Sequence, residues 1–489
     1  MVNSNLAYQD IEVEIPQIKD DPVKWCTVAL SEVLQNGHRL EASVYDAETR
    51  QAKITIQNSK YGSSQLTKKG WLIKEAYHAP RFKRNYVNKR AKNAVGFLGS
   101  SDILDVHAKP QKYILSSLAQ KLDLFVEPQM VLLSCSGTIG NISFVNKNLS
   151  PFAISQHVIK LSCYKYSGYI YTCLKHPLIS SQVKSLIYGS VIQEIEPEHL
   201  DKVVIPNAPQ LIMEKIHNLI IESYKLRDES NALIDNATQL LIDELHLPDI
   251  SSFEVDDYKK NAPVETFSVK LSDLNGRADA SYHLPIVDAI INHLRKYAEE
   301  VTTVGDERIS SDIILPGRFK RVYVDKEYGV RFLGGKELNQ LDPSTEKYLS
   351  KKAHANQLKD SLGIKPNSLL TPARGSLGEV VFPPKHFKGW AISDNLMQIL
   401  SFDSICGYLY IFLNTEYGKT LIKRFTYGGV VDAIEPEHIK QVAIPLLKNK
   451  SAQKKINDLA LEANQKRYES YKLEQQALKT MDNEVIFAK

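Results

Sequence analysis

The feature that most constrains this chain is an internal duplication. The stretch YGSVIQEIEPEHLDKVVIP at Tyr188–Pro206 returns as YGGVVDAIEPEHIKQVAIP at Tyr427–Pro445, with 11 of 19 positions identical. Four shorter stretches recur in the same order, at offsets that stay between 235 and 240 residues. RFKRNYV, GFLG, LLSCSGTIG and AISQHVIKL return as RFKRVYV, RFLG, LLTPARGSLG and AISDNLMQI. Because the period has the size of a domain, we predict two tandem homologous domains rather than a solenoid.

Each copy ends in a long helical pattern. In the first, apolar and small residues from Ile212 to Leu240 alternate steps of four and three, which is a heptad seam, and Pro248 stops the helix. The second copy has the equivalent seam from Ile456 to Ala477. Seven acids and three bases lie in the first helical region, against six acids and nine bases in the second, which favours their pairing. The alternative is that each helix covers its own domain.

The predicted fold class is therefore α/β (mixed α+β). Two tandem homologous globular domains are each followed by a long helix, and the two helices pair antiparallel as a coiled-coil spacer. Short apolar stretches such as VVIP, VAIP, ISFV and EVVF predict strands. The predicted divisions are an N-terminal arm 1–25, a first domain 26–206, a first long helix 207–247, a linker 248–264, a second domain 265–445 and a second long helix 446–489.

Composition excludes several classes of protein. A net charge of +4 is too small for a basic arm, so a nucleic-acid surface must come from local clustering. Five cysteines without a CxxC pair argue against a metal site and a disulfide framework, and fit a reducing cytoplasm. The sequence shows no signal region at its start and no apolar run near the about 18 residues that span a membrane, so we expect a cytoplasmic protein.

The duplication suggests a use. Two similar domains on an antiparallel helix pair are related by a pseudo-two-fold axis, as in a homodimer fused into one chain. The backbone of duplex DNA has the same local symmetry, and two-fold proteins contact two half-sites at a fixed spacing. A helix of about 36 residues is ~54 Å long, enough to hold two domains more than one turn of DNA apart.

The order of the motifs resembles the DNA-specificity subunit of Type I restriction–modification systems. The resemblance rests on RFKR-x-YV, FLG, (S/A)-(S/R)-G-(T/S)-x-G, AIS-x-(H/N), YG-(S/G)-V-x-x-IEPEH and IP before a long helix, in both copies. It implies that each domain is a target-recognition domain for one part of a bipartite DNA site. It also implies that the helices act as a spacer and dock two methyltransferase (modification) subunits, with a restriction/translocase subunit as a further partner. AdoMet, ATP and Mg²⁺ would then belong to the partners, and this chain would hold no cofactor.

Basic clusters are the candidate contacts with double-stranded DNA, because neutralised phosphates release counterions. The alternative is a solvated strand with snorkelling side chains. Six of twelve residues are basic in Arg81–Lys92. The candidates are Arg81, Lys83, Arg84, Lys89, Arg90 and Lys92, with Arg318, Lys320 and Arg321 in the second copy.

The G-x-x-G turns are a second group of candidates, because such turns can present backbone N–H groups to phosphate. A tight turn between strands explains their glycines as well, and we favour it. Arg374 is the exception, since arginine can recognise guanine. The candidates here are Ser136, Gly137, Arg374 and Gly375.

Base recognition should lie where the copies differ, since shared segments cannot distinguish two half-sites. The polar stretches Arg50–Gln65 and Ser344–Lys359 are the candidates, although ordinary surface loops look alike. Their named residues are Gln57, Asn58, Lys60, Lys351 and Lys352. The predicted docking positions on the helices are Ile216, Leu219, Leu233, Ile456, Leu459 and Leu473.

None of the catalytic motifs considered is complete in this sequence. FPPK at Phe382–Lys385 lacks both ends of an amino-methylating motif, and GVRFLGGKE lacks the lysine and hydroxyl residue of a P-loop. The single histidine of each EPEH cannot make a metal site, and the proline indicates a helix start. We expect a non-catalytic subunit that directs methyltransferase and restriction subunits to DNA. The alternatives are a duplicated adaptor for protein partners and an enzyme with an unrecognised site.

Overall fold

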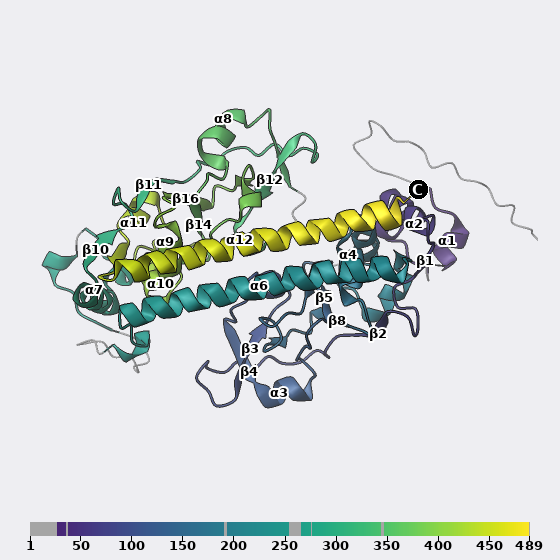
Figure 1. Ribbon diagram of the computed structural model, residues 1–489, viewed down its shortest axis with the longest axis horizontal. Coiled ribbons are helices and arrows are strands. Elements are labelled where there is room, and N and C mark those ends of the chain that lie inside the picture. Colours follow the sequence, from purple (N-terminus) through teal and green to yellow (C-terminus); the bar gives the residue numbers. More distant parts are fainter. Residues whose placement is uncertain are drawn as a thin grey trace, which may run out of the picture. The chain divides into compact units, whose positions relative to one another are not determined.

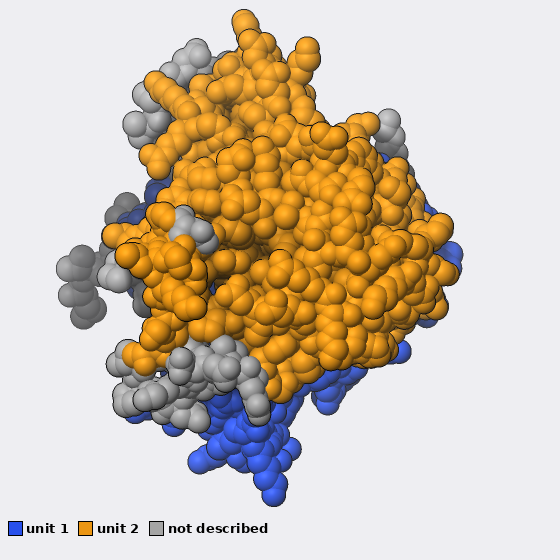
Figure 2. All heavy atoms as spheres, turned by 90° about the vertical axis from the view of Figure 1, so that its left-hand side faces the viewer, with its two compact units in different colours: residues 1–104, 108–221, 474–489 blue, residues 105–107, 222–473 orange. Residues whose placement is uncertain are grey.

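The structure, a computed structural model, describes residues 27–35, 38–189, 193–253, 266–274, 276–343 and 347–488. By their contacts these residues form two compact units (Figure 2). Unit 1 takes the described residues up to 104, 108–221 and those from 474 onward, and unit 2 takes 105–107 and 222–473. The predicted arm 1–25 and most of the predicted linker 248–264 lie outside the described residues, and the predicted domain boundaries stay a prediction.

Unit 1 is built from three small sheets and short helices. The sheets have the strand orders β2-β8-β5-β6, β4-β3-β7 and β1-β9. The strands are β1 (Ser63–Gln65), β2 (Ile73–Tyr77), β3 (Ala94–Leu98), β4 (Lys112–Leu115), β5 (Val131–Ser134), β6 (Ile142–Phe144), β7 (Ala153–Ile154), β8 (Val158–Cys163) and β9 (Val204–Pro206). The helices are α1 (Leu30–Gln35), α2 (Ala47–Gln57), α3 (Ser116–Lys121), α4 (Ser167–Lys175) and α5 (Pro177–Ser185), with a 3-10 turn at Pro197–Lys202.

Unit 2 repeats this plan. Its sheets have the orders β11-β16-β14, β13-β12-β15 and β10-β17. The strands are β10 (Glu300–Thr303), β11 (Ser310–Ile314), β12 (Gly329–Leu333), β13 (Tyr348–Ser350), β14 (Ser368–Pro372), β15 (Ala391–Ile392), β16 (Leu396–Ser401) and β17 (Ala443–Leu446). The helices are α7 (Pro285–Tyr297), α8 (Ala355–Gln357), α9 (Cys406–Leu413), α10 (Glu416–Lys423) and α11 (Pro436–Lys440).

The register shows that the copies share more than sequence. In unit 1, β3 pairs in parallel with β7 through Phe97 and Ala153, and in unit 2, β12 pairs in parallel with β15 through Phe332 and Ala391. The predicted strands VVIP, VAIP and ISFV are confirmed as β9, β17 and β6. The predicted strand EVVF is wrong, because only an isolated bridge at Val381 forms there. The predicted fold class, mixed α/β with a long helix after each copy, is confirmed.

The two long helices are α6 (Gln210–Glu244) and α12 (Lys450–Met481) (Figure 1). Inside unit 2 they lie side by side and antiparallel. Near one end of this stretch Ser223 Oγ donates to the Ser470 carbonyl oxygen at 2.9 Å, and near the other Asn449 Nδ2 donates to Glu244 at 3.0 Å. Lys466 forms an ion pair with Glu229 between them at 2.9 Å, as the opposite charges of the helices predict. A regular coiled coil stays a prediction.

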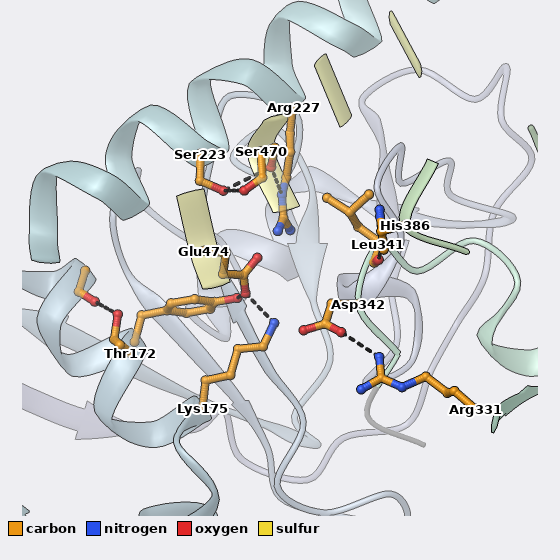
Figure 3. Close-up of polar contacts among 12 residues, drawn as sticks. Thr172, Lys175, Ser223, Arg227, Arg331, Leu341, Asp342, His386, Ser470 and Glu474 are labelled. Atoms are coloured by element: carbon orange, nitrogen blue, oxygen red, sulfur yellow. Dashed lines mark hydrogen bonds and ion pairs between the residues drawn. The ribbon is translucent and has the colours of Figure 1, made fainter. Parts of the chain in front are cut away.

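Each helix contributes to both units. Residues of α6 up to Ile221 belong to unit 1 and those from Glu222 to unit 2, while α12 passes into unit 1 at Glu474. In unit 1 the end of α12 packs on α4, where Lys175 and Glu474 form an ion pair (Figure 3). The alternative that each helix covers only its own domain is therefore wrong.

The buried stripe of each helix includes the predicted seam but is shifted at every second position. Ile216 and Ile456 are fully buried, as predicted. The predicted positions Leu219, Leu233, Leu459 and Leu473 are only half-buried, and the residues after them are buried instead, namely Ile220, Ile234, Ala460 and Glu474. The stripe shifts because each helix packs against a globular part as well as against the other helix.

A polar centre of the helix pair in unit 2 has local two-fold symmetry. Arg227 Nε donates to Ser470 Oγ at 2.9 Å, and Arg467 Nε donates to Ser230 Oγ at 3.4 Å. Arg227 and Arg467 are 240 residues apart, and so are Ser230 and Ser470. The two arginines therefore occupy equivalent positions in the two copies, and so do the two serines that they contact. Figure 3 shows the contact of Arg227 with Ser470. Equivalent residues facing each other are the mark of a two-fold contact.

Glycines bring the short helices close to the long ones. A Cβ on Gly168 of α4 would lie 2.8 Å from the His217 carbonyl oxygen, and one on Gly407 of α9 would lie 2.4 Å from that of Asn457. His217 Nδ1 accepts from the Gly168 N–H at 3.1 Å, and Asn457 Oδ1 accepts from the Gly407 N–H at 2.8 Å. Both copies thus start a helix against the long helix by the same close approach.

Candidate nucleic-acid interface

The basic stretch of unit 1 is irregular and is fixed by aromatic packing on β3. The Phe82 ring meets Phe97 edge to face at 6.3 Å, and the Arg84 guanidinium lies over the Phe97 ring at 5.7 Å. Arg84 Nη2 also donates to Ser155 Oγ at 3.4 Å. The motifs RFKR, GFLG and AIS, far apart in sequence, therefore meet at one place.

Unit 2 repeats this packing almost contact for contact. Phe319 meets Phe332 edge to face at 6.5 Å, and Arg321 lies over Phe332 at 5.4 Å. The backbone ties agree as well, because the Ser155 N–H donates to the Leu98 carbonyl at 2.9 Å and the Ser393 N–H donates to the Leu333 carbonyl at 3.0 Å. The aromatic residues anchor the segment, which leaves its basic side chains at the surface.

Most of the basic candidates are exposed. Arg84 is half-buried by its packing, whereas the others present their side chains to solvent: Arg81, Lys83, Lys89, Arg90, Lys92, Arg318, Lys320 and Arg321. Lys351 and Lys352 are exposed too and follow β13, whose Leu349 forms a bridge with Tyr323 of the basic segment. Clustered, exposed cations of this kind are suited to phosphate.

Carboxylates hold two of these arginines in the free chain. Arg81 Nη2 contacts Glu194 at 2.6 Å although the arginine side chain is 76% exposed, and Arg321 Nη2 contacts Asp394 at 2.6 Å. The hydrogen bond that Arg321 donates to Asp394 raises the pKa of Arg321 above its ordinary value. Each arginine side chain is exposed while its carboxylate is mostly buried, so a phosphate can approach the arginine from the solvent and compete with the carboxylate.

The G-x-x-G stretches are tight turns. Gly137 and Gly140 have φ of 78° and 89°, and Gly375 and Gly378 have φ of 86° and 93°, which only glycine adopts easily. The Gly137 N–H donates to the Gln193 carbonyl at 3.4 Å, and the Gly375 N–H donates to the Asp432 backbone carbonyl at 3.0 Å. These N–H groups are used within the chain, which favours the turn interpretation. Ser136 and Arg374 stand at the start of the turns.

The EPEH stretches are helix starts, as expected. In both copies the glutamate before the proline forms a reciprocal capping box with the histidine three positions after that glutamate: Glu196 with His199, and Glu435 with His438. Glu196 also accepts from Tyr188 at 2.7 Å and contacts His78 at 2.6 Å. Burial alone would raise the pKa of Glu196, but these hydrogen bonds lower it below its ordinary value. The prediction of a structural turn is confirmed.

Three candidates lie apart from this cluster of motifs. Gln57 ends α2, Asn58 caps it, and Lys60 lies in the turn before β1. The helix and strand recur in unit 2 as α7 and β10, and β4 with α3 recurs as β13 with α8. Both stretches predicted for base recognition thus fall on shared elements; part of the second, residues 344–346, lies outside the described residues.

Two negative findings concern the described residues only. No helix among them is both long enough and apolar enough to cross a membrane. Nor does this part of the chain bring together three or more histidine, cysteine, aspartate or glutamate side chains in a way that could hold a metal ion.

The residues that the sequence analysis missed are the polar partners of the basic motif, notably Glu194 and Asp394. A signal existed, because both fall at mismatches inside motifs that are otherwise shared between the copies. The contact partners could not be found from either motif alone.

No family model matches the sequence, and no curated protein does either. Among solved structures, the chain is similar to the S subunit of a Type I restriction–modification system from M. genitalium, with 12% identity and a TM-score of 0.35, over 88% of this chain and 97% of that chain. It is similar to the HsdS subunit from Thermoanaerobacter tengcongensis, with 13% identity and a TM-score of 0.26, over 86% and 95%.

A third similar chain comes from a structure on the complex assembly and conformational transition of the type I R-M system. It has 13% identity and a TM-score of 0.26, over 80% of this chain and 90% of that one. All three identities are 13% or lower, and all three TM-scores are 0.35 or lower.

Proposed function

We propose that this chain is a sequence-specific DNA-binding subunit that recognises a bipartite site and directs methyltransferase and restriction subunits to it. The observation that supports this most is the duplicated surface. Each unit places the same arginine over the same phenylalanine, with exposed basic residues around it. A surface built twice from cations on an aromatic anchor suits the phosphates of two DNA segments.

The helix pair would set the distance between these segments. The 35 residues of α6 extend about 52 Å at 1.5 Å per residue, more than one turn of DNA. The reciprocal contacts of Arg227 and Arg467 support a two-fold arrangement of the helices, which is the symmetry that duplex DNA offers.

The helices would also dock the modification subunits, and the burial of their residues limits how. Ile216 and Ile456 are fully buried within this chain, so partners would contact the half-buried leucines and the exposed faces instead. Two equivalent helix surfaces suit two modification subunits. In this proposal the chain is non-catalytic, and AdoMet, ATP and Mg²⁺ belong to the partner subunits.

A salt titration of binding to random-sequence duplex DNA tests the proposal. We expect measurable affinity at low salt that falls linearly with the logarithm of salt concentration. The triple variant Arg81→Gln, Lys83→Gln, Arg84→Gln should bind more weakly to every duplex. Its salt slope should fall by up to about 2.7, or ~0.9 for each phosphate that the chain no longer neutralises.

A matched control removes the same charge elsewhere. Lys448, Lys454 and Lys455 are exposed near the start of α12, and their replacement by Gln should leave affinity and slope nearly unchanged. Negligible affinity of the unaltered chain even at low salt would contradict the proposal and favour an adaptor for protein partners. Equal decreases in affinity for both triple variants would show that only net charge matters.

A further inference from the structure

Three loops meet beside the basic motif of unit 1 and are fixed by backbone hydrogen bonds. The Cys135 N–H donates to the His157 carbonyl at 2.9 Å, which ties the turn after β5 to the loop after β7. The Ile195 N–H donates to the Cys135 carbonyl at 3.0 Å, and Gly137 contacts Gln193 as described. The third loop, which precedes the EPEH helix start, is thereby held against the first two.

Unit 2 holds the same three loops by the same bonds. The Ala373 N–H donates to the Asn395 carbonyl at 2.8 Å, and the Ile434 N–H donates to the Ala373 carbonyl at 2.9 Å. The Gly375 N–H donates to the Asp432 carbonyl, completing the set. The backbone frame is therefore common to both copies and cannot by itself distinguish two half-sites.

The side chains on this frame differ, although the residues that flank them are identical. Ser155 and Ser393 precede the second loop, and Gly137 and Gly375 follow the variable position of the first. Next to these fixed residues and in the third loop, four polar positions of unit 1 carry a different side chain in unit 2. Ser136 is replaced by Arg374, Gln156 by Asp394, His157 by Asn395, and Glu194 by Ala433.

Several of these variable side chains touch one another or the shared arginines. In unit 1, Ser136 Oγ donates to Glu194 at 3.4 Å, and Glu194 holds Arg81. In unit 2, Arg374 Nη1 donates to Asn395 Oδ1 at 3.4 Å, and the adjacent Asp394 holds Arg321. Each variable cluster is thus bordered by the cations that the proposed function assigns to phosphate.

From this we infer that the three-loop cluster is where each unit recognises bases, with Arg374 contacting a guanine in one half-site and Gln156 an adenine in the other. The inference rests on the proposed function and deepens it. Arginine forms a bidentate contact with guanine O6 and N7, and glutamine forms one with adenine N6 and N7. The cluster combines a shared backbone frame with changed side chains, and these side chains lie beside the basic motif.

Selection from a randomised duplex library tests this assignment with the full chain. The unaltered chain should enrich a two-part site. Arg374→Ser, which installs the residue of the first copy, should reduce the preference for one guanine in one half by roughly 5- to 150-fold, the range for a good bidentate contact. Arg374→Lys should reduce the same preference although it keeps the charge, since an ammonium lacks the planar fork. Gln156→Asp should alter only the other half.

The control is the variant Arg308→Ser. Arg308 is an exposed arginine of unit 2 that pairs with Glu300 and Asp306 away from the cluster, and the variant should enrich the same site as the unaltered chain. Unchanged sites in both Arg374 variants would overturn the assignment while leaving the proposed function intact. The assignment would also be overturned if Arg374→Ser weakened binding to all duplexes equally and Arg374→Lys had normal affinity, because this result indicates a phosphate contact. If the unaltered chain enriches no site, the proposed function fails and this assignment fails with it.

Discussion

At the scale of residues, the two copies use different side chains, a lysine and a glutamine, to make equivalent hydrogen bonds from a central strand to a loop. Lys160 on β8 is fully buried and donates to the carbonyls of Asp123 and Phe125. Gln398, the equivalent residue on β16, donates to the carbonyls of Ser361 and Gly363 at 2.9 and 3.0 Å. Both side chains tie a central strand to a neighbouring loop. The sequence alone aligns these positions but does not show that a charged side chain is buried at one of them.

Replacing Lys160 by glutamine gives a testable prediction, because glutamine is the residue at the equivalent position of the second copy. Burial lowers its pKa to about 8, so the charged form is costly, and Lys160→Gln should change the free energy of unfolding by less than about 1 kcal/mol. Lys160→Met should cost about 2–3 kcal/mol, because it leaves the carbonyls of Asp123 and Phe125 without this donor. Urea unfolding of both variants measures this. A glutamine variant as unstable as the methionine variant would contradict the shared role.

His386 predicts a pH dependence in unit 2. Its ring stacks on Tyr471 of α12 at 3.7 Å, Nε2 contacts the Leu341 carbonyl at 2.8 Å, and burial lowers its pKa to about 4 (Figure 3 shows the contact with Leu341). Because the unfolded chain binds a proton near its ordinary pKa of about 6.5 and the folded chain does not, stability should fall by about 2 kcal/mol from pH 7 to pH 5.

The control for this dependence is His386→Phe, which keeps the ring on Tyr471 but cannot titrate. Urea midpoints at pH 7 and pH 5 should differ more for the unaltered chain than for the variant. The same pH dependence in both proteins would assign the effect to other groups.

At the scale of elements, the sequence predicted a long helix after each copy, and α6 and α12 are these helices. The periodicity is strong, and prolines mark the ends of the first helix. The seam was placed correctly at Ile216 and Ile456 but one residue early at Leu219 and Leu233, because a linear pattern does not tell how many neighbours a helix has. The stretch Arg50–Gln65 was predicted to recognise bases, with an ordinary surface loop as the alternative. Its residues up to Gln57 belong to α2, of which Ala52 and Ile56 are buried.

The docking of the end of α12 on α4 depends on a buried carboxylate. Glu474 is fully buried and accepts from Tyr171 and Lys175, whereas the equivalent position of α6 is the apolar Ile234. Glu474→Ala should cost about 3 kcal/mol, since it leaves a largely buried cation without its partner, and should raise hydrogen exchange in residues 474–486.

Glu462, which is exposed on the same helix, supplies the control, and Glu462→Ala should leave the exchange unchanged. Unchanged protection of residues 474–486 in Glu474→Ala would show that apolar contacts alone hold the end of α12 on unit 1.

At the scale of the whole molecule, duplication is the property from which the proposed function follows. The order of the motifs predicted two equivalent copies, and the structure places the same aromatic, basic and turn motifs together in each unit. The sequence did not show that these motifs meet at one place, because their contacts join strands that lie far apart along the chain. The variable cluster became visible only when contacts from the structure were combined with the differences between the copies.

The most direct test exchanges residues 26–206 for the corresponding region of another such chain and maps methylated adenines in a host that also carries the modification subunits. We predict a new bipartite motif in which one half changes, while the other half and the spacing stay as they were. If both halves changed together, or if neither did, the two copies could not be separate recognition modules, and the central claim would be contradicted.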